Sequence, residues 1–472
     1  MNQFLDIRTI RKGAGLRLRD LAKLAGVSHS ELSKCERGLV LPNDDFFASV
    51  AEVLGVDASK LQELQSRLLK TIIPGEGYVT AKALRRLVKD RKSEYSKSSI
   101  KVMDLFCGIG GLSHGFEQTG QFQVTLGLDL LEDRVLTFCE NHPMATAIVD
   151  NIQNVDFESL ANAGPLPDII IGGPPCQGFS SIRPFRALTE NDPRNNLFES
   201  FALIVNTFKP KWFVLENVVG LLTHKQGETL RIMLQLFQQI GYTVDWKVLN
   251  AALYGLPQRR ERLIIVGNSE GKTFYWPEPS HFFYGRSMAG KNYGQTIDSL
   301  PLFGNQLSPA VTVMEAIHDL PPIKAGESSD KYKEDVDLTS YEKMMRRNSK
   351  VLTLHEATKH SDHMLDIIRN AGYNRSALPE GMTTSGFSSS YSRIEPDLPS
   401  VTLTVNFVHP ASNKCIHPFQ DRALTPREGA RLQGFEDDYV FRGSRAQIVK
   451  QIGNAVPPLL GKVIAEALLK HI

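Results

Sequence analysis

The stretch PDIIIGGPPCQGFS, residues 167–180, decides how this chain folds. Its first part is an apolar run, which predicts a buried parallel strand. Its second part is a Gly/Pro loop that carries Cys176. Because open α/β sheets place their binding sites at the carboxyl ends of strands, we expect this loop to present the Cys176 thiol as a nucleophile. A buried structural cysteine is the alternative, but a core has no need for a rigid Pro-Pro-Cys loop.

Five further apolar runs extend this interpretation. They are IKVMDLF, VTLGLD, TAIVD, WFVLEN and RLIIVG, which start at residues 100, 124, 146, 212 and 262. Strands that alternate with helical or loop segments predict an α/β fold with a doubly wound, mostly parallel sheet. Residues 275–392 are polar and predict an irregular second domain with helical fragments such as DHMLDIIRNAG (362–372). The chain ends in an amphipathic helix, LLGKVIAEALLKHI (459–472).

Composition sets mild bounds on function. The 472 residues are 42% hydrophobic, which is ample for about three domains. A net charge of +2 gives no argument for a nucleic-acid partner unless basic residues are clustered. Five cysteines make no disulfide framework, and the chain shows neither a secretory leader nor a run of about 18 apolar residues. We therefore expect a cytoplasmic protein with no membrane segment.

Residues 1–66 predict a separate helical unit. The segment LRLRDLAKLAG (16–26) suits one helix, Gly26 ends it, and Ser28 with Glu31 forms a capping box for the next helix. This spacing resembles phage-repressor-type helix-turn-helix domains, and a plain helical bundle is the alternative. In a helix-turn-helix, the residues that enter the DNA groove are Ser28, His29, Ser30 and Lys34.

Residues 67–100 form a basic linker by composition. The stretch at 82–92 predicts a helix that either touches DNA phosphates or is simply solvated, and both readings stay open.

Six strings, in this order, resemble the DNA (cytosine-5)-methyltransferase family of bacterial restriction-modification type. They are DLFCGIGG (104–111), GGPPCQGFS (172–180), ENV (216–218), QRRER (258–262), TPREGARLQGF (425–435) and IGNAVPP (452–458). The resemblance implies a catalytic and cofactor-binding domain at 101–274, a target-recognition domain at 275–400, and late motifs at 401–472 whose last helix completes the catalytic domain.

The resemblance also implies catalytic roles. Cys176 would add to C6 of a cytosine turned out of duplex DNA, and Glu216 would hold N3 and the exocyclic amine. Arg260 and Arg262 would position the pyrimidine oxygen and the carboxylate. Without the resemblance, these two arginines could instead form a surface ion cluster with Glu261.

The cofactor implied by the resemblance is S-adenosyl-L-methionine. Phe106 would stack on the adenine, Asp129 would accept from the ribose hydroxyls, and Asp150 would contact the adenine amino group. For Asp129 alone, a helix N-cap is an equal alternative. The full set implied for the cofactor is Phe106, Gly108, Gly110, Gly111, Asp129, Asp150, Pro175 and Asn454.

Three expectations concern partners. Arg393, in EGMTTSGFSSSYSR (380–393), would contact target DNA, and a disordered polar loop is the alternative. No metal is expected, because His355 and His360 are five residues apart and do not share a helical face. We expect a monomer on its target site, a dimer on an operator of its own gene, and a cognate restriction endonuclease as a separate protein. A transcription regulator that only senses the cofactor and an RNA methyltransferase are the competing hypotheses.

Overall fold

The computed structural model describes residues 7–36, 43–62, 86–87, 98–175, 197–283, 285, 287, 289, 307–347, 349–383 and 386–472. The chain divides into two compact units, Met1–Thr80 and Ala81–Ile472. Within the described residues, no helix is both long and apolar enough to cross a membrane.

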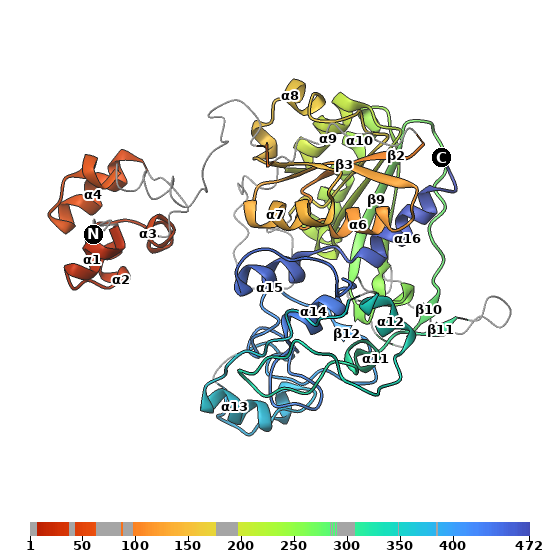
Figure 1. Ribbon diagram of the computed structural model, residues 1–472. Coiled ribbons are helices and arrows are strands. Elements are labelled where there is room, and N and C mark those ends of the chain that lie inside the picture. Colours follow the sequence, from red (N-terminus) through yellow and green to blue (C-terminus); the bar gives the residue numbers. More distant parts are fainter. Residues whose placement is uncertain are drawn as a thin grey trace. The chain divides into compact units, whose positions relative to one another are not determined.

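The first unit is helical (Figure 1). Its helices are α1 (Ile7–Gly13), α2 (Leu18–Leu24), α3 (His29–Glu36) and α4 (Asp44–Leu54). Gly26 has φ +65° just after α2, and Ser28 Oγ accepts from the Glu31 amide at 3.5 Å. The expected glycine stop and serine cap are therefore confirmed. Apolar residues of all four helices share one core, with Leu21, Leu32 and Phe47 almost fully buried.

The second unit is built on an eight-stranded sheet of order β1-β4-β3-β2-β5-β6-β9-β7. The strands are β1 (Arg86–Leu87), β2 (Ile100–Leu105), β3 (Phe122–Asp129), β4 (Thr146–Val149), β5 (Ile169–Gly172), β6 (Trp212–Val218), β7 (Thr243–Asn250) and β9 (Glu261–Asn268). Neighbours from β4 through to β6 are parallel, and β9 runs antiparallel between β6 and β7. All six expected strands are confirmed.

Two strands of this sheet were not expected. In β7, exposed and half-buried residues alternate over the first four positions, so no apolar run marks this strand. At β1, the helix predicted over 82–92 is wrong for Arg86–Leu87, which pairs antiparallel with β4, and the rest of that stretch lies outside the described residues. Backbone pairing along an open sheet edge here outweighs the local helical pattern.

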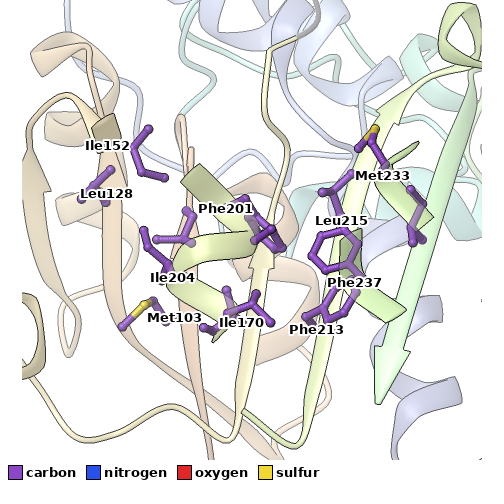
Figure 2. Packing of buried hydrophobic residues seen from close by; sticks show 14 of the residues in the cluster. Met103, Leu128, Ile152, Ile170, Phe201, Ile204, Phe213, Leu215, Met233 and Phe237 are labelled. Carbon is purple, nitrogen blue, oxygen red and sulfur yellow. The ribbon is translucent and has the colours of Figure 1, made fainter. Parts of the chain in front are cut away.

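Helices cover both faces of the sheet (Figure 1). One face carries α8 (Phe157–Ala161), α9 (Leu197–Phe208) and α10 (Glu228–Gln239), and the other carries α6 (Gly111–Glu117), α7 (Glu132–Asn141) and α16 (Pro458–Leu468). Alternate strand residues enter opposite cores. Figure 2 shows the first core, where Phe201, Phe213 and Phe237 pack together.

The C-terminal helix α16 packs directly against α6, although the two helices come from opposite ends of the second unit's sequence. A Cβ on Gly115 would overlap the Pro458 carbonyl, so the two helices are as close as a glycine allows. The last helix therefore completes a face begun by the first strands.

The rest of the second unit is irregular. Its α-helices are α11 (Val313–Ile317), α12 (Ser340–Arg346), α13 (Asp362–Arg369), α14 (Pro426–Leu432) and α15 (Arg445–Asn454). Its strand pairs are β8 (Gln258–Arg259) with β12 (Ser400–Val401) and β10 (His281–Phe282) with β11 (Ser308–Pro309). Short 3₁₀ helices occur at Ile152–Asn154, Val219–Leu222, His224–Gly227, Ala251–Tyr254 and Arg375–Ala377. The expected helical fragment at 362–372 is confirmed by α13.

Candidate active site

The candidate site lies where the strand order changes direction. The chain proceeds from β2 outward to β3 and β4, and then returns to β5 and β6 on the other side of β2. Parallel strands bring their carboxyl ends to one edge of the sheet, and ligands bind at such a switch point. Phe106, Asp129, Pro175 and Glu216 all lie at or just beyond these strand ends.

Glu216 and Arg262 form an ion pair at this edge. Glu216 is opposite Ile264 in the β6–β9 ladder, and Arg262 lies two residues away on the same face. Arg262 Nε is 2.7 Å from Glu216 Oε1, with the two side chains 12% and 11% exposed. Burial lowers the pKa of Arg262, and the neighbouring carboxylate opposes that shift. The pair thus fixes the position of the Glu216 carboxylate at the carboxyl-end edge of the sheet.

The first residues of the cysteine loop lie against this carboxylate. Asn217 Nδ2 donates to the Pro174 carbonyl at 3.4 Å. A Cβ on Gly173 would be 3.1 Å from Glu216 Oε2, so a larger residue there would crowd the carboxylate. Pro175 is exposed. Cys176 itself lies outside the described residues.

Arg260 and Arg262, expected to act together, have different partners. Arg260 is 2% exposed and donates to the main-chain carbonyls of Leu403, Gly453 and Ala455 at 3.3, 3.2 and 3.0 Å. Burial lowers its pKa further than the Glu216 carboxylate can restore. The surface cluster with Glu261 does not occur, since Glu261 is 3% exposed and its carboxylate accepts from the Ala289 amide and Asn250.

The turn after β2 adopts left-handed backbone angles. Phe106, Gly108 and Gly110 have φ of +61°, +55° and +86°. Asp129 Oδ2 accepts from the Gly108 amide at 3.0 Å, and its Oδ1 accepts from the Leu131 amide at 2.9 Å. Burial raises the pKa of Asp129, while both backbone bonds favour its charged form. Asp129 therefore holds the turn through its carboxylate, and it does not act as the N-cap of α7. Each carboxylate oxygen keeps a lone pair that can accept a hydrogen bond from a ligand.

The three glycines of this turn differ in their surroundings. Beside Gly108, a Cβ would meet no atom closer than the Phe106 carbonyl at 4.0 Å. Beside Gly110 it would overlap His142, and beside Gly111 the Val456 carbonyl. Gly108 therefore faces open space, whereas Gly110 and Gly111 pack so closely against His142 and Val456 that a side chain would not fit.

Two residues of this region have no counterpart in the sequence predictions. Leu130 directly follows Asp129 and is 62% exposed, which is unusual for a leucine beside a buried strand end. Asp104, at the end of β2, is buried, and Ser113 Oγ donates to it at 2.6 Å. Burial raises the pKa of Asp104 to about 8. Leu130 could have been found in the sequence, because it is an apolar residue directly after the acid that ends β3. Nothing in the sequence distinguishes Asp104 from an acid at the surface.

The two other cofactor candidates are Asp150 and Asn454. The Asp150 amide donates to the Asp129 carbonyl at 3.1 Å, so the two acids are adjacent at the ends of β3 and β4. Asn454 is exposed at the end of α15.

The structure corrects the DNA contact expected of Arg393. Its five N–H groups donate to the carbonyls of Ala371, His417, Gln420 and Ile368 and to Asp421 Oδ1, at 2.6–3.1 Å. With every donor used inside the protein, none is left for phosphate or bases.

The helix-turn-helix candidates lie at the start of α3 and along it. Ser28 and His29 are exposed, and Ser30 and Lys34 belong to the helix, although their side chains lie outside the description. His355 and His360 serve the irregular domain, where His355 bonds Thr425 and Pro321 and His360 accepts from the Ala423 amide.

Comparison with known proteins agrees with this geometry. The family model for C-5 cytosine-specific DNA methylase matches residues 100–470. The chain belongs to this family. A helix-turn-helix domain model matches residues 6–64.

Relatives cover nearly the same region. The Type II methyltransferase M.AgeI of Thalassovita gelatinovora is 34% identical over 78% of this chain and 99% of its own length. M1.HphI of Haemophilus parahaemolyticus is 36% identical over 79% of this chain and 87% of its own length. A crystal structure assigned as a prophage-encoded DNA modification methyltransferase of E. coli has a TM-score of 0.60 and 25% identity, and covers 79% of this chain and 99% of its own. The chain is thus a DNA (cytosine-5)-methyltransferase with an amino-terminal helix-turn-helix domain.

Proposed function

We propose that this enzyme methylates cytosine C5 in duplex DNA through a covalent bond between Cys176 and C6, with S-adenosyl-L-methionine as the methyl donor. The observation that carries this proposal is the Glu216–Arg262 pair beside Gly173 and Pro174. Cys176 follows Pro175 directly in the chain. A nucleophile and a fixed carboxylate at one strand edge are what attack on a pyrimidine ring requires.

The residues of this chain divide the work. The Cys176 thiolate adds to C6, and the ring electrons move toward C5 and N3. The Glu216 carboxylate accepts hydrogen bonds from the exocyclic amine and from a proton held at N3, which spreads the developing charge. Arg262 keeps that carboxylate oriented. Methyl transfer to C5 would leave the donor as the thioether S-adenosyl-L-homocysteine. The C5 proton then leaves to water, the S–C6 bond breaks, the thiolate is regenerated, and the proton taken up at N3 returns to water.

The turn after β2 fits an adenosyl ligand. The space beside Gly108 is open, Asp129 and Asp150 are acids at adjacent strand ends, and Leu130 offers an exposed apolar surface. The residues that would hold the cofactor are Phe106, Gly108, Leu130, Asp129, Asp150, Pro175 and Asn454, with Gly110 and Gly111 shaping the turn. When bound, S-adenosyl-L-methionine supplies an electrophilic methyl group.

The remaining parts of the proposal concern DNA and regulation. The target base is turned out of the duplex, and residues 275–400 grip the DNA around it. The helix-turn-helix domain binds an operator as a dimer, through Ser28, His29, Ser30 and Lys34, and represses the enzyme's own gene. The enzyme works in the cytoplasm and protects DNA from a cognate endonuclease.

The test is methyl transfer from labelled S-adenosyl-L-methionine to duplex DNA, with bisulfite sequencing to map the modified base. Wild-type protein should modify one cytosine of a fixed sequence, and Cys176→Ser should lose activity by orders of magnitude while still binding DNA. Transfer by Cys176→Ser at the wild-type rate would exclude the covalent route. Transfer to RNA in place of duplex DNA would exclude the proposed substrate.

A further inference from the structure

The turn Cys107–Gly111 has one open side and one closed side. A Cβ on Gly110 would be 2.9 Å from Phe138 Cδ2 and would overlap His142 Nε2. A Cβ on Gly111 would be 3.2 Å from Phe435 Cζ. Nothing comparable lies beside Gly108. The closed side therefore supports the backbone of the turn, and the open side is left for a ligand.

A hydroxyl from the late part of the chain reaches the backbone of this turn. The Tyr439 hydroxyl donates to the Ile109 carbonyl, and both residues are almost fully buried. Burial raises the pKa of Tyr439 well above its usual range, so the hydroxyl stays a neutral donor. The Ile109 side chain packs in the same cluster as Phe435 and Tyr439. The middle of the turn is thus fixed by both its backbone and its side chain.

One histidine packs against Tyr439, and a second lies beside Gly110 of the turn. The His114 ring meets Tyr439 edge-on at 5.0 Å, and its Nε2 is 2.9 Å from Glu436 Oε2. The His142 ring lies 4.4 Å from Phe138, and its Nδ1 is 2.7 Å from Glu117 Oε2. Each imidazole is therefore oriented by its own carboxylate.

We propose that Tyr439 is a positioning residue for S-adenosyl-L-methionine, acting through the Ile109 carbonyl, with His114 packed against its ring. The inference rests on the proposed use of this turn for the cofactor. A turn that is already fixed in its binding geometry loses less conformational entropy when a ligand binds, so the contact increases cofactor affinity without touching the cofactor.

The chain offers a matched control for a purely structural role. The Tyr341 hydroxyl donates to the Arg431 carbonyl at 2.7 Å, and Tyr341 is 5% exposed. Both tyrosines thus donate to a backbone carbonyl from a buried position, but the Tyr341 partner is in α14, and Tyr341 supports α14 instead of the cofactor turn. Tyr341→Phe removes a hydroxyl of the same kind, although the Arg431 carbonyl still accepts from the Gly434 amide at 2.9 Å.

The experiment compares Tyr439→Phe and Tyr341→Phe by calorimetric titration with S-adenosyl-L-methionine. Both variants should melt a few degrees below wild type. We expect Tyr439→Phe alone to raise the Kd about tenfold, the factor that loss of one buried hydrogen bond corresponds to. Steady-state kinetics should show a higher KM for the cofactor with little change in kcat, and DNA affinity should stay at the wild-type value.

Three outcomes decide the matter. An unchanged Kd in Tyr439→Phe, or equal rises in both variants, would overturn the proposal, because the hydroxyl would then serve stability alone. Failure of wild-type protein to bind the cofactor would instead overturn the proposed function. If Tyr439→Phe does not fold, His114→Ala provides the second test, since it removes the ring that packs edge-on against Tyr439, and an unchanged Kd there also overturns the proposal.

Discussion

The sheet and the irregular region around α14 are stabilised by opposite means. In the sheet, neighbouring strands bond one another, and the space between strands and helices is filled by apolar side chains such as Phe213, Phe237 and Ile170. Around α14, Arg422, Arg427 and Arg431 are all completely buried. The sheet is held by apolar packing, and the region around α14 adds a network of buried ion pairs to its own apolar cluster.

The backbone explains this difference. In the sheet the ladder uses the carbonyls, whereas irregular chain leaves them without partners. The buried arginines supply donors: Arg422 to the Ile323 carbonyl at 3.1 Å, Arg427 to Thr353 at 2.9 Å and Arg431 to Ala316 at 3.0 Å. Their charges are met by Glu428, Asp437 and Asp319. An arginine in irregular structure thus replaces the ladder that a strand would have provided.

The largest effect is expected for Arg431→Met. This change leaves Asp319 and Asp437 buried without their main cation, and a broken buried pair costs about 3–5 kcal/mol. Chemical unfolding should show this loss. The matched control is Arg231→Met, which breaks the exposed pair with Glu228 at 3.7 Å and should stay within about 0.5 kcal/mol of wild type. Equal losses in the two variants would remove the contrast between the regions.

A smaller and more specific effect separates Arg260 from Arg262. Arg260→Lys loses bonds to three carbonyls and should destabilise the protein by about 1–3 kcal/mol, with kcat close to wild type in the folded fraction. Arg262→Lys should fold normally and reduce kcat, because a lysine ammonium cannot reproduce the Nε contact with Glu216. Unfolding curves and single-turnover rates measure the two effects. If the effects were exchanged, Arg260 would be the residue at the substrate.

A further difference between the two regions lies in their pH dependence. The pKa of Asp104 is raised to about 8 by burial, so the folded state keeps this proton while the unfolded state, with an ordinary pKa of 3.8, releases it. Its contribution to stability therefore falls as the pH rises from about 4 to about 8. Asp104→Asn should flatten that decline in unfolding free energy measured across this range.

Glu428 in the irregular region should show the reverse sign. Arg422 holds the pKa of Glu428 far below its ordinary 4.5, despite burial. Its contribution is therefore present above that ordinary value and is lost as the pH falls toward the folded-state pKa. Glu428→Gln should lower stability at neutral pH and reduce the loss on acidification.

For Asp104, the contradicting result is an unfolding free energy of Asp104→Asn that changes with pH as steeply as that of wild type. Asp104 would then be ionised in the folded protein.

The sequence could predict the sheet because apolar runs and turn residues are local signals. Six strands, the end of α2 and the Ser28 cap all follow from such signals. It could not distinguish arginines that bind backbone from arginines that bind ligands. Arg260 and Arg393 are held by hydrogen bonds to main-chain carbonyls of distant segments. Tyr439 is held in the same way by the carbonyl of Ile109, which is 330 residues away. The partners of long polar side chains depend on tertiary structure.

The central claim is that Cys176 attacks beside the carboxylate of Glu216. A duplex with 5-fluorocytosine at the target tests it directly. Fluorine takes the place of the C5 proton and cannot be removed as that proton is, so the elimination step is blocked and the S–C6 bond persists. After incubation with S-adenosyl-L-methionine, the protein should be digested and the modified peptide identified by mass spectrometry. The account predicts a denaturation-stable adduct on Cys176, absent in Cys176→Ser and formed about a hundredfold more slowly in Glu216→Gln. An adduct on another residue, or one that persists in Cys176→Ser, would contradict it.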